Sequence, residues 1–285
     1  MLKFDKNLSA VHGYLCSDGY VIRNPPTQRH KYYKMGLRNY NETLLVDFQE
    51  KFNSVFGIKP NLQKDGRCTI GNKEIYYKLT NDFSYYSREW RLPKLSKDNL
   101  RYWLRAFFDC EGWVMCRKAK DRHIGADSVN YGGLKQIKKS LSRLNITSKL
   151  KKIKDKGIWR LHIFGKDNLI KFQKEINFLH PIKNKKLQKS IDSYVNYKWE
   201  FPENLSSRGQ FVLNIIRKRL NGKIPRRISI CSKIRKNLLE MQKELYSNFK
   251  ILSLVSKKRI NGLGNYYYEL NINRLEDIEK IKTLL

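Results

Sequence analysis

Apolar residues recur with two different periods along this chain, and together they predict alternating helices and strands. Helical spacing is present in residues 8–15 and 100–108, which are mostly apolar. Residues 32–38 and 159–163 instead alternate apolar with cationic or polar side chains, which is the period of a strand. Leu45, Phe48 and Phe52 then form one apolar helical face. Up to about residue 197, the pattern predicts helix, two strands, helix, two strands and helix, twice over.

The two copies are clearest where their first helices end. One helix ends in Asp18-Gly19 and the other in Glu111-Gly112, and each is followed by a short apolar strand. The two acids lie 93 positions apart. Because a repeat at fixed spacing is the mark of a duplicated unit, we interpret residues 1–95 and 96–199 as two copies of an αββαββα repeat.

Three further correspondences follow in the same order. They pair Asn41-x3-Leu45 with Asn130-x3-Leu134, Ile70-x2-Lys73 with Ile163-x2-Lys166, and Phe83-x4-Arg88 with Phe178-x4-Lys183. The second of these pairs is again separated by 93 positions. The fold class expected from them is α+β, with two pseudo-symmetric repeats.

The pattern changes after about residue 200, which predicts a separate small α+β domain over 203–285. Helices are expected over 211–220 and 232–246, and strands near 250–256 and 265–272, joined by the basic segment 257–264. Two helices followed by a basic hairpin suggest a winged-helix domain that binds nucleic acid. Any small α+β domain would give a similar pattern, so that alternative stays open.

The charge of the chain predicts a polyanionic partner. Its 285 residues contain 59 Lys and Arg against 26 Asp and Glu, a formal net charge of +33. No apolar run is long enough to span a membrane, and no secretory signal is evident. The five cysteines form no Cys-x-x-Cys pair and no zinc spacing with histidine, so we expect reduced thiols in a cytoplasmic or, in a eukaryotic host, organellar protein.

The paired acids predict a metal site. One helix ending in Asp-Gly needs only a glycine cap, but two equivalent endings in a duplication favour a function. If the two helices pack side by side, Asp18 and Glu111 meet, and two close carboxylates need cations between them. Small residues at equivalent places, Gly13 and Ala106, would permit such packing. Oxygen ligands favour Mg²⁺ or another divalent cation such as Mn²⁺.

Residues 11–19 and 104–112 resemble two copies of the LAGLIDADG motif, and residues 178–187 are similar to the segment after the last helix of a repeat in that family. The resemblance covers residues 7–197. It implies a monomeric homing endonuclease whose motif helices form the interface between two saddle-shaped sheets. These sheets would lie in the major groove of double-stranded DNA, and both strands would be hydrolysed across the minor groove.

The resemblance also implies roles for individual residues. Asp18 and Glu111 match the acids that bind the metal, and Lys183 and Arg88 match a basic residue that assists the water or the phosphate. Asn41 and Asn130 match a polar position that orders solvent near the metals. By strand alternation alone, the candidate groove-facing residues are Lys34, Arg38, Arg117, Arg160 and His162.

Two departures from the family pattern stand out. Glu111 is one methylene longer than the usual Asp, which predicts unequal cutting of the two strands. Cys16 replaces an acid that Asp109 retains in the second motif. The expected function is metal-assisted cleavage at a specific DNA site. An RNA-splicing maturase that binds intron RNA, or a DNA-binding regulator without cleavage activity, remain alternatives.

Overall fold

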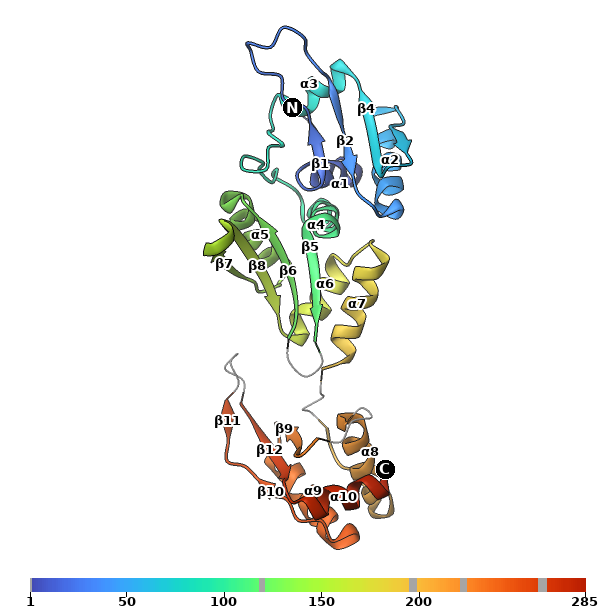
Figure 1. The fold of residues 1–285 in the computed structure, drawn as a ribbon, viewed down its shortest axis with the longest axis vertical. Helices are drawn as coiled ribbons and strands as arrows, with labels where there is room; N and C mark the ends of the chain where they lie inside the picture. The colour runs from blue at the N-terminus through green and yellow to red at the C-terminus, as the bar shows by residue number, and fades with distance from the viewer. Residues whose placement is uncertain (1, 118–120, 195–198, 221–224, 261–265) are drawn as a thin grey trace. The chain divides into compact units, whose positions relative to one another are not determined.

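The computed structural model describes all residues except 1, 118–120, 195–198, 221–224 and 261–265. It divides into two compact units, Met1–Tyr194 and Val195–Leu285, which are described separately (Figure 1). In the described residues, no helix combines the length and apolar character that crossing a bilayer requires.

The first half of unit 1 is one αββαββα repeat. Its elements are α1 (Lys6–Leu15), β1 (Gly19–Val21), β2 (Lys34–Arg38), α2 (Glu42–Phe56), β3 (Asn61–Gln63), β4 (Arg67–Gly71) and α3 (Lys73–Thr80). The strands form an antiparallel sheet in the order β1-β2-β4-β3. Asp5 begins α1 by accepting a hydrogen bond from the Leu8 amide at 2.7 Å.

The second half repeats this pattern and adds one helix. Its elements are α4 (Lys97–Glu111), β5 (Gly112–Cys116), β6 (Arg122–Ser128), α5 (Tyr131–Arg143), β7 (Lys149–Ile153), β8 (Ile158–Phe164), α6 (Lys166–Glu175) and α7 (Pro181–Asp192), with a 3₁₀ turn, η1 (Lys154–Lys156), between β7 and β8. The sheet order, β5-β6-β8-β7, is equivalent to that of the first half. The predicted pair of repeats is confirmed.

Each sheet buries one face under the helices of its own half. In β2, the side chains of Met35 and Leu37 are buried, while Lys34 and Arg38 at the two ends of the strand are exposed; Gly36, between the two apolar residues, is also buried. Leu45, Phe48 and Phe52 of α2 cover this buried face. The same alternation in the second half leaves the opposite face of each sheet without a helix.

Unit 2 is also α+β. Its elements are η2 (Leu205–Ser207), α8 (Arg208–Leu220), β9 (Ile228–Ser232), α9 (Arg235–Phe249), β10 (Leu254–Val255), β11 (Arg259–Ile260), β12 (Tyr266–Ile272) and α10 (Leu275–Leu284). Strand β12 pairs antiparallel with β9, β10 and β11. Residues 261–264 of the expected basic segment lie outside the described part.

The topology of unit 2 differs from that of a winged helix. A winged helix has two successive helices, joined by a short turn, between its first two strands. Here α9 is the one helix that the described residues place between β9 and β10. The unit also begins before residue 203, because Trp199 and Phe201 pack against its core.

Candidate functional site

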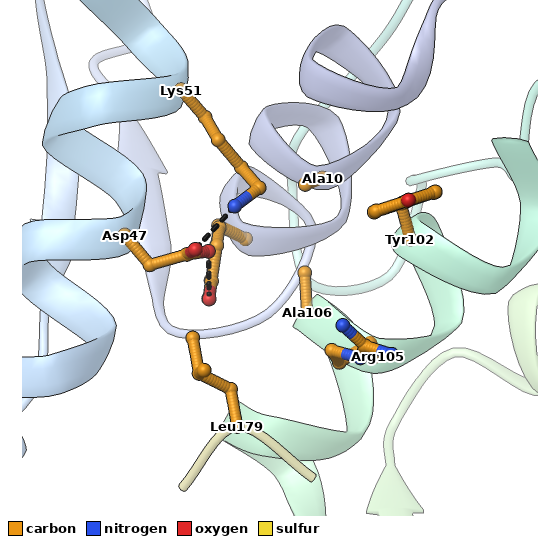
Figure 2. A pocket seen from close by; sticks show the side chains of 8 residues that line it. Ala10, Asp47, Lys51, Tyr102, Arg105, Ala106 and Leu179 are labelled. Atoms are coloured by element: carbon orange, nitrogen blue, oxygen red, sulfur yellow. Dashed lines mark hydrogen bonds and ion pairs between the residues drawn. The ribbon is translucent and has the colours of Figure 1, made fainter. Parts of the chain in front are cut away.

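Helices α1 and α4 pack against each other closely enough that only a small residue fits between them. A Cβ atom added to Gly13 would lie 2.6 Å from the Trp103 carbonyl oxygen and 3.1 Å from the Ala106 Cβ. Figure 2 shows the region beside this contact, where a cavity of about 30 Å³ is lined by Ala10 and Ala106. Gly13 on α1 and Ala106 on α4 are therefore small enough to permit this short distance between the two helices.

A buried neutral histidine holds the other part of this interface. His12 is fully buried, and its Nδ1 accepts a hydrogen bond from Trp103 Nε1 at 3.0 Å. Burial lowers the pKa of His12 to about 3, so the imidazole is uncharged at neutral pH. The contact crosses from α1 to α4 and stabilises the packing of the two halves.

An acid followed by a glycine stands at each passage from helix to strand, where the strand leaves very close to the helix backbone. A Cβ atom at Gly19 would lie 2.6 Å from the Tyr14 carbonyl oxygen, and one at Gly112 would collide with the Phe108 carbonyl. The glycines therefore allow β1 and β5 to start directly after the acids. Glu111 is thus the last residue of α4, whereas Asp18 lies in the turn three residues after the end of α1, so the first helix is shorter than the sequence pattern predicted.

The two acids are close enough to influence each other. Burial and the nearby Asp18 carboxylate raise the pKa of Glu111 to about 7, and Lys183 opposes this shift. A bound cation would reduce the repulsion between the two carboxylates and so favour the charged form of both. The expectation that the duplication brings Asp18 and Glu111 together agrees with the structure.

The Asp18 side of the site opens into a cleft. Asn39 Nδ2 donates to Asp18 Oδ2 at 2.7 Å, which fixes the carboxylate at the edge of a cleft of about 540 Å³. Asn41 also lines this cleft, and its buried amide oxygen has no hydrogen-bond partner among the described residues. An oxygen acceptor without a partner is available to a solvent molecule or a cation.

The Glu111 side is supported by a lysine at the end of α4. Lys183 Nζ donates to the carbonyl oxygens of Asp109 at 2.6 Å and Cys110 at 3.1 Å, so it neutralises the negative end of the helix. Asp109 is buried and accepts hydrogen bonds from the amides of Leu179 and His180 at 3.1 and 3.0 Å. Burial nevertheless raises the pKa of Asp109 to about 6.

These groups suit a hard divalent cation. Carboxylate and amide oxygens are the ligands that Mg²⁺ prefers, and this ion keeps several waters and takes further ligands from phosphates. In the described residues, no group of three or more His, Cys, Asp or Glu side chains gathers around one point, so a closed protein cage is absent there. Asp18 and Glu111 fit the open kind of site, with Asn41 beside it.

One family model matches most of the second half of unit 1. Residues 98–177 match the family model of the LAGLIDADG-like domain. This segment of the chain, in the second half of unit 1, is therefore similar to that family. Nearly all of α4, which ends at Glu111, lies inside this match, whereas α1 and Asp18 precede it.

Two curated relatives are similar to parts of the chain. One is the homing endonuclease I-ApeI of Aeropyrum pernix, 28% identical over 136 residues, which are 44% of this chain and 60% of that protein. The other is the replication factor C small subunit of Thermococcus kodakarensis, 27% identical over 202 residues, which are 66% of this chain and 21% of that protein. The chain thus matches less than two thirds of the length of either relative.

Solved LAGLIDADG structures resemble the chain more distantly. I-DmoI in complex with DNA and Ca is 17% identical, with a TM-score of 0.48, and the match covers 64% of this chain and 98% of that one. I-WcaI bound to its DNA recognition sequence is 16% identical, with a TM-score of 0.47, over 66% and 88% of the two chains.

The structure does not place two of the predicted site residues where the sequence correspondence put them. Arg88 lies in an exposed turn of the first half, where no helix equivalent to α7 follows α3, so it does not mirror Lys183. Asn130 caps α5 instead of facing the acids. Its Oδ1 accepts from the Gly133 amide at 2.8 Å and its Nδ2 donates to the Trp90 carbonyl at 2.7 Å.

The candidate groove-facing residues differ in the charge they can offer. Lys34 and Arg38 of β2 and Arg117 just after β5 are exposed cations. Arg160 instead forms a two-pronged ion pair with Asp127, with both hydrogen bonds at 2.6 Å. Burial lowers the pKa of His162 to about 4, so this residue is a neutral side chain on the face predicted to be cationic.

The sequence prediction missed Asn39, which holds the Asp18 carboxylate. It precedes Asn41 by two positions, and its Oδ1 also accepts a hydrogen bond from the Asn41 amide at 2.8 Å. Its counterpart in the second half is Ser128, whose hydroxyl accepts from the Asn130 amide at 3.1 Å. The repeated local hydrogen bond could have signalled this position, but its role toward the acid required the fold.

Proposed function

We propose that this chain is a site-specific DNA endonuclease that hydrolyses both strands of a duplex with the help of a divalent cation. The observation that carries the proposal is the pair Asp18 and Glu111, the first just after α1 and the second at the end of α4, two closely packed helices. Burial and the nearby Asp18 carboxylate raise the pKa of Glu111 to about 7, which favours binding of a cation. Because unit 1 already contains both copies of the site, the protein would act as a monomer.

Asp18 and Glu111 would hold Mg²⁺ or Mn²⁺, together with oxygens of the DNA backbone. The bound ion would lower the pKa of water and stabilise charge on the phosphate. Asn39 would keep the Asp18 carboxylate in place, and the unpartnered Asn41 oxygen would orient solvent in the cleft. Lys183 would act as a positioning residue, because its ammonium is engaged by the end of α4 and stabilises the charged form of Glu111.

Duplex DNA is the partner that charge and shape favour. The net charge of +33 and the exposed Lys34, Arg38 and Arg117 would neutralise phosphates, while neutral side chains such as His162 would contact base edges. Two roughly equivalent half-sites also match the local two-fold symmetry of duplex DNA. Two acids retained at the centre favour cleavage over binding alone, since binding does not require them.

The test is incubation of the protein with a plasmid library of candidate insertion sites and Mg²⁺, followed by mapping of the ends. The expected result is a double-strand break at one sequence, absent when EDTA replaces Mg²⁺. Tight binding to DNA without a break under any divalent cation would contradict the proposal and favour a regulator. Preference for intron RNA over duplex DNA would favour a maturase.

A further inference from the structure

The described residues of unit 2 have the element order and strand pairing of the two repeats of unit 1 from the second strand of the repeat onward. Helix α9 connects β9 to β10 as α2 connects β2 to β3, and α10 follows β12 as α3 follows β4. The sheet path β9-β12-β10 corresponds to β2-β4-β3 and to β6-β8-β7, and all these pairings are antiparallel. The short β11 is an addition to this pattern.

The buried positions of the three copies have identical spacing. In each copy, a first buried residue is followed by four more at offsets of 2, 10, 13 and 17. The first copy has Met35, Leu37, Leu45, Phe48 and Phe52, and the second has Ile124, Ala126, Leu134, Ile137 and Leu141. Unit 2 has Ile228, Ile230, Leu238, Met241 and Leu245. This set fixes how the second strand packs against the helix that follows it. Sharing five positions over the same span is hard to attribute to a generic α+β domain.

The last strand and helix show a second set of matching positions. Ile272, Ile278 and Ile281 lie at offsets of 6 and 9, as do Ile163, Leu169 and Phe172 and, in the first copy, Ile70, Tyr76 and Leu79. In unit 2 these residues belong to the core that α8 and α9 also cover. The agreement therefore extends from the second strand of the repeat to its final helix.

The third copy has no acid where the other two have theirs. In the sequence, Asn221-Gly222 follow α8 where Asp18-Gly19 follow α1 and Glu111-Gly112 end α4. Only six positions separate Gly222 from Ile228, against 16 from Gly19 to Met35, so the connection at this point is shorter than in the first copy. The structural description does not include residues 221–224, and this comparison rests on the sequence alone.

The open face of the third sheet carries anchored arginines. Helices α8, α9 and α10 all pack on the face of Ile228, Ile230 and Leu270, so they leave the other face uncovered within unit 2. On that face, Arg227 Nη2 donates to Asn271 Oδ1 at 2.6 Å, and Arg259 Nη1 pairs with Glu269 at 2.9 Å.

The side chains of Arg227 and Arg259 remain about half exposed, at 51% and 49%. At the edge of the sheet, Arg219 Nε donates to the Ser229 carbonyl at 3.1 Å. Glu269 is the acid that accompanies these three arginines on the described face, which is therefore net positive. Arginine held in this way is well suited to phosphate oxygens, because its planar fork is already oriented.

We infer that unit 2 is a third, non-catalytic copy of the repeat, and that Arg227 and Arg259 on its open sheet face bind the phosphate backbone of duplex DNA. This inference rests on the proposed function, because it assigns to the third sheet the partner proposed for the first two. Contacts to phosphate carry no sequence information, so the third copy adds affinity and leaves the recognition of bases to unit 1.

The test compares two charge-matched variants of the full chain on a labelled random-sequence duplex without divalent cation. Arg227→Gln/Arg259→Gln removes two charges from the open face, whereas Lys236→Gln/Lys243→Gln removes two from the exposed far side of α9. Because each phosphate contact contributes about 0.9 to the slope of log K against log salt, the arginine pair should make the slope shallower by about 1.8. The lysine pair should leave the slope unchanged.

Glu269→Gln provides a test in the opposite direction, and it stays informative if the arginine variant fails to fold. Removing the acid that faces Arg259 should tighten binding and steepen the salt dependence. Equal effects of the two double variants, or no tightening by Glu269→Gln, would overturn the inference while leaving cleavage by unit 1 intact. A wild-type chain that binds no duplex DNA at any salt concentration would instead refute the proposed function, and with it this inference.

Discussion

Replacing Gly13 by alanine should force helices α1 and α4 apart. The added Cβ would lie 2.6 Å from the Trp103 carbonyl oxygen, about 0.8 Å closer than the 3.4 Å at which ordinary contacts begin. The neighbour is backbone, which cannot rotate away as a flexible side chain would. Overpacking of this kind costs about 1–3 kcal/mol, against a gain in helix propensity of up to about 1 kcal/mol.

With the full propensity gain, the expected net loss in the unfolding free energy of unit 1 is therefore up to about 2 kcal/mol. For a domain of this size, each kcal/mol lowers Tm by about 2–4 °C. Scanning calorimetry would measure the shift. The matched control is Gly132→Ala in α5, where the new Cβ would make an ordinary contact at 3.5 Å with Asn130 Oδ1, so that the helix gains stability.

The same displacement should also reduce cleavage, because the acids lie at the ends of the helices that move. A misplacement approaching 1 Å can cost about a hundredfold in rate. DNA binding, measured separately, should change little. If Gly13→Ala were as stable and as active as Gly132→Ala, the close approach of α1 and α4 would not control the site, and the reasoning would be wrong.

Three further predictions address the buried histidine, the cation and the two half-sites. The pKa of His12 falls from 6.5 to about 3 on folding, so the unfolded state binds the proton more tightly. The unfolding free energy should therefore decrease as the pH falls below about 6.5. Chemical denaturation of His12→Gln at several pH values should show a smaller decrease. EDTA should stop cleavage but leave binding in a gel-shift assay, since phosphate contacts do not need the ion. The halves should cut at different rates, because Glu111 is longer than Asp18 and has Lys183 beside it; a plasmid time course should therefore show a transient nicked form, and linear product with no nicked species would contradict this.

The sequence alone was sufficient to predict the duplicated fold and the two acids. Periodicity identifies helices and strands because one face of each element is buried, as at Met35 and Leu37. The acid-glycine endings were visible because each strand starts so close to its helix that Gly19 and Gly112 are required. These signals are local, and they are repeated at a fixed spacing.

The remaining site residues depended on contacts between distant segments. Arg88 was matched to Lys183 by spacing, but α7 has no counterpart after α3. The side-chain amide of Asn130 donates a hydrogen bond to the carbonyl of Trp90, which is 40 positions away, and no local pattern reveals this contact. His162 is neutral because the fold buries it beside His123 and near Arg160.

The topology of unit 2 was predicted only in part for a similar reason. Strand β9 is a five-residue run, Ile228–Ser232, next to a basic segment, and the sequence prediction overlooked it. Helix α10, Leu275–Leu284, was also missed. Without β9 the sequence pattern shows two helices and a hairpin, and this pattern suggested a winged helix.

The most direct test of the central claim is cleavage by full-length variants that neutralise one acid at a time. Asp18→Asn and Glu111→Gln should each abolish double-strand cleavage in Mg²⁺ while binding the target with nearly unchanged affinity. The matched controls Asp82→Asn and Glu50→Gln make the same chemical changes at exposed positions and should cut like the wild type. Full double-strand cleavage by either site variant, or an equal loss in the controls, would contradict the assignment of Asp18 and Glu111 as the metal-binding pair.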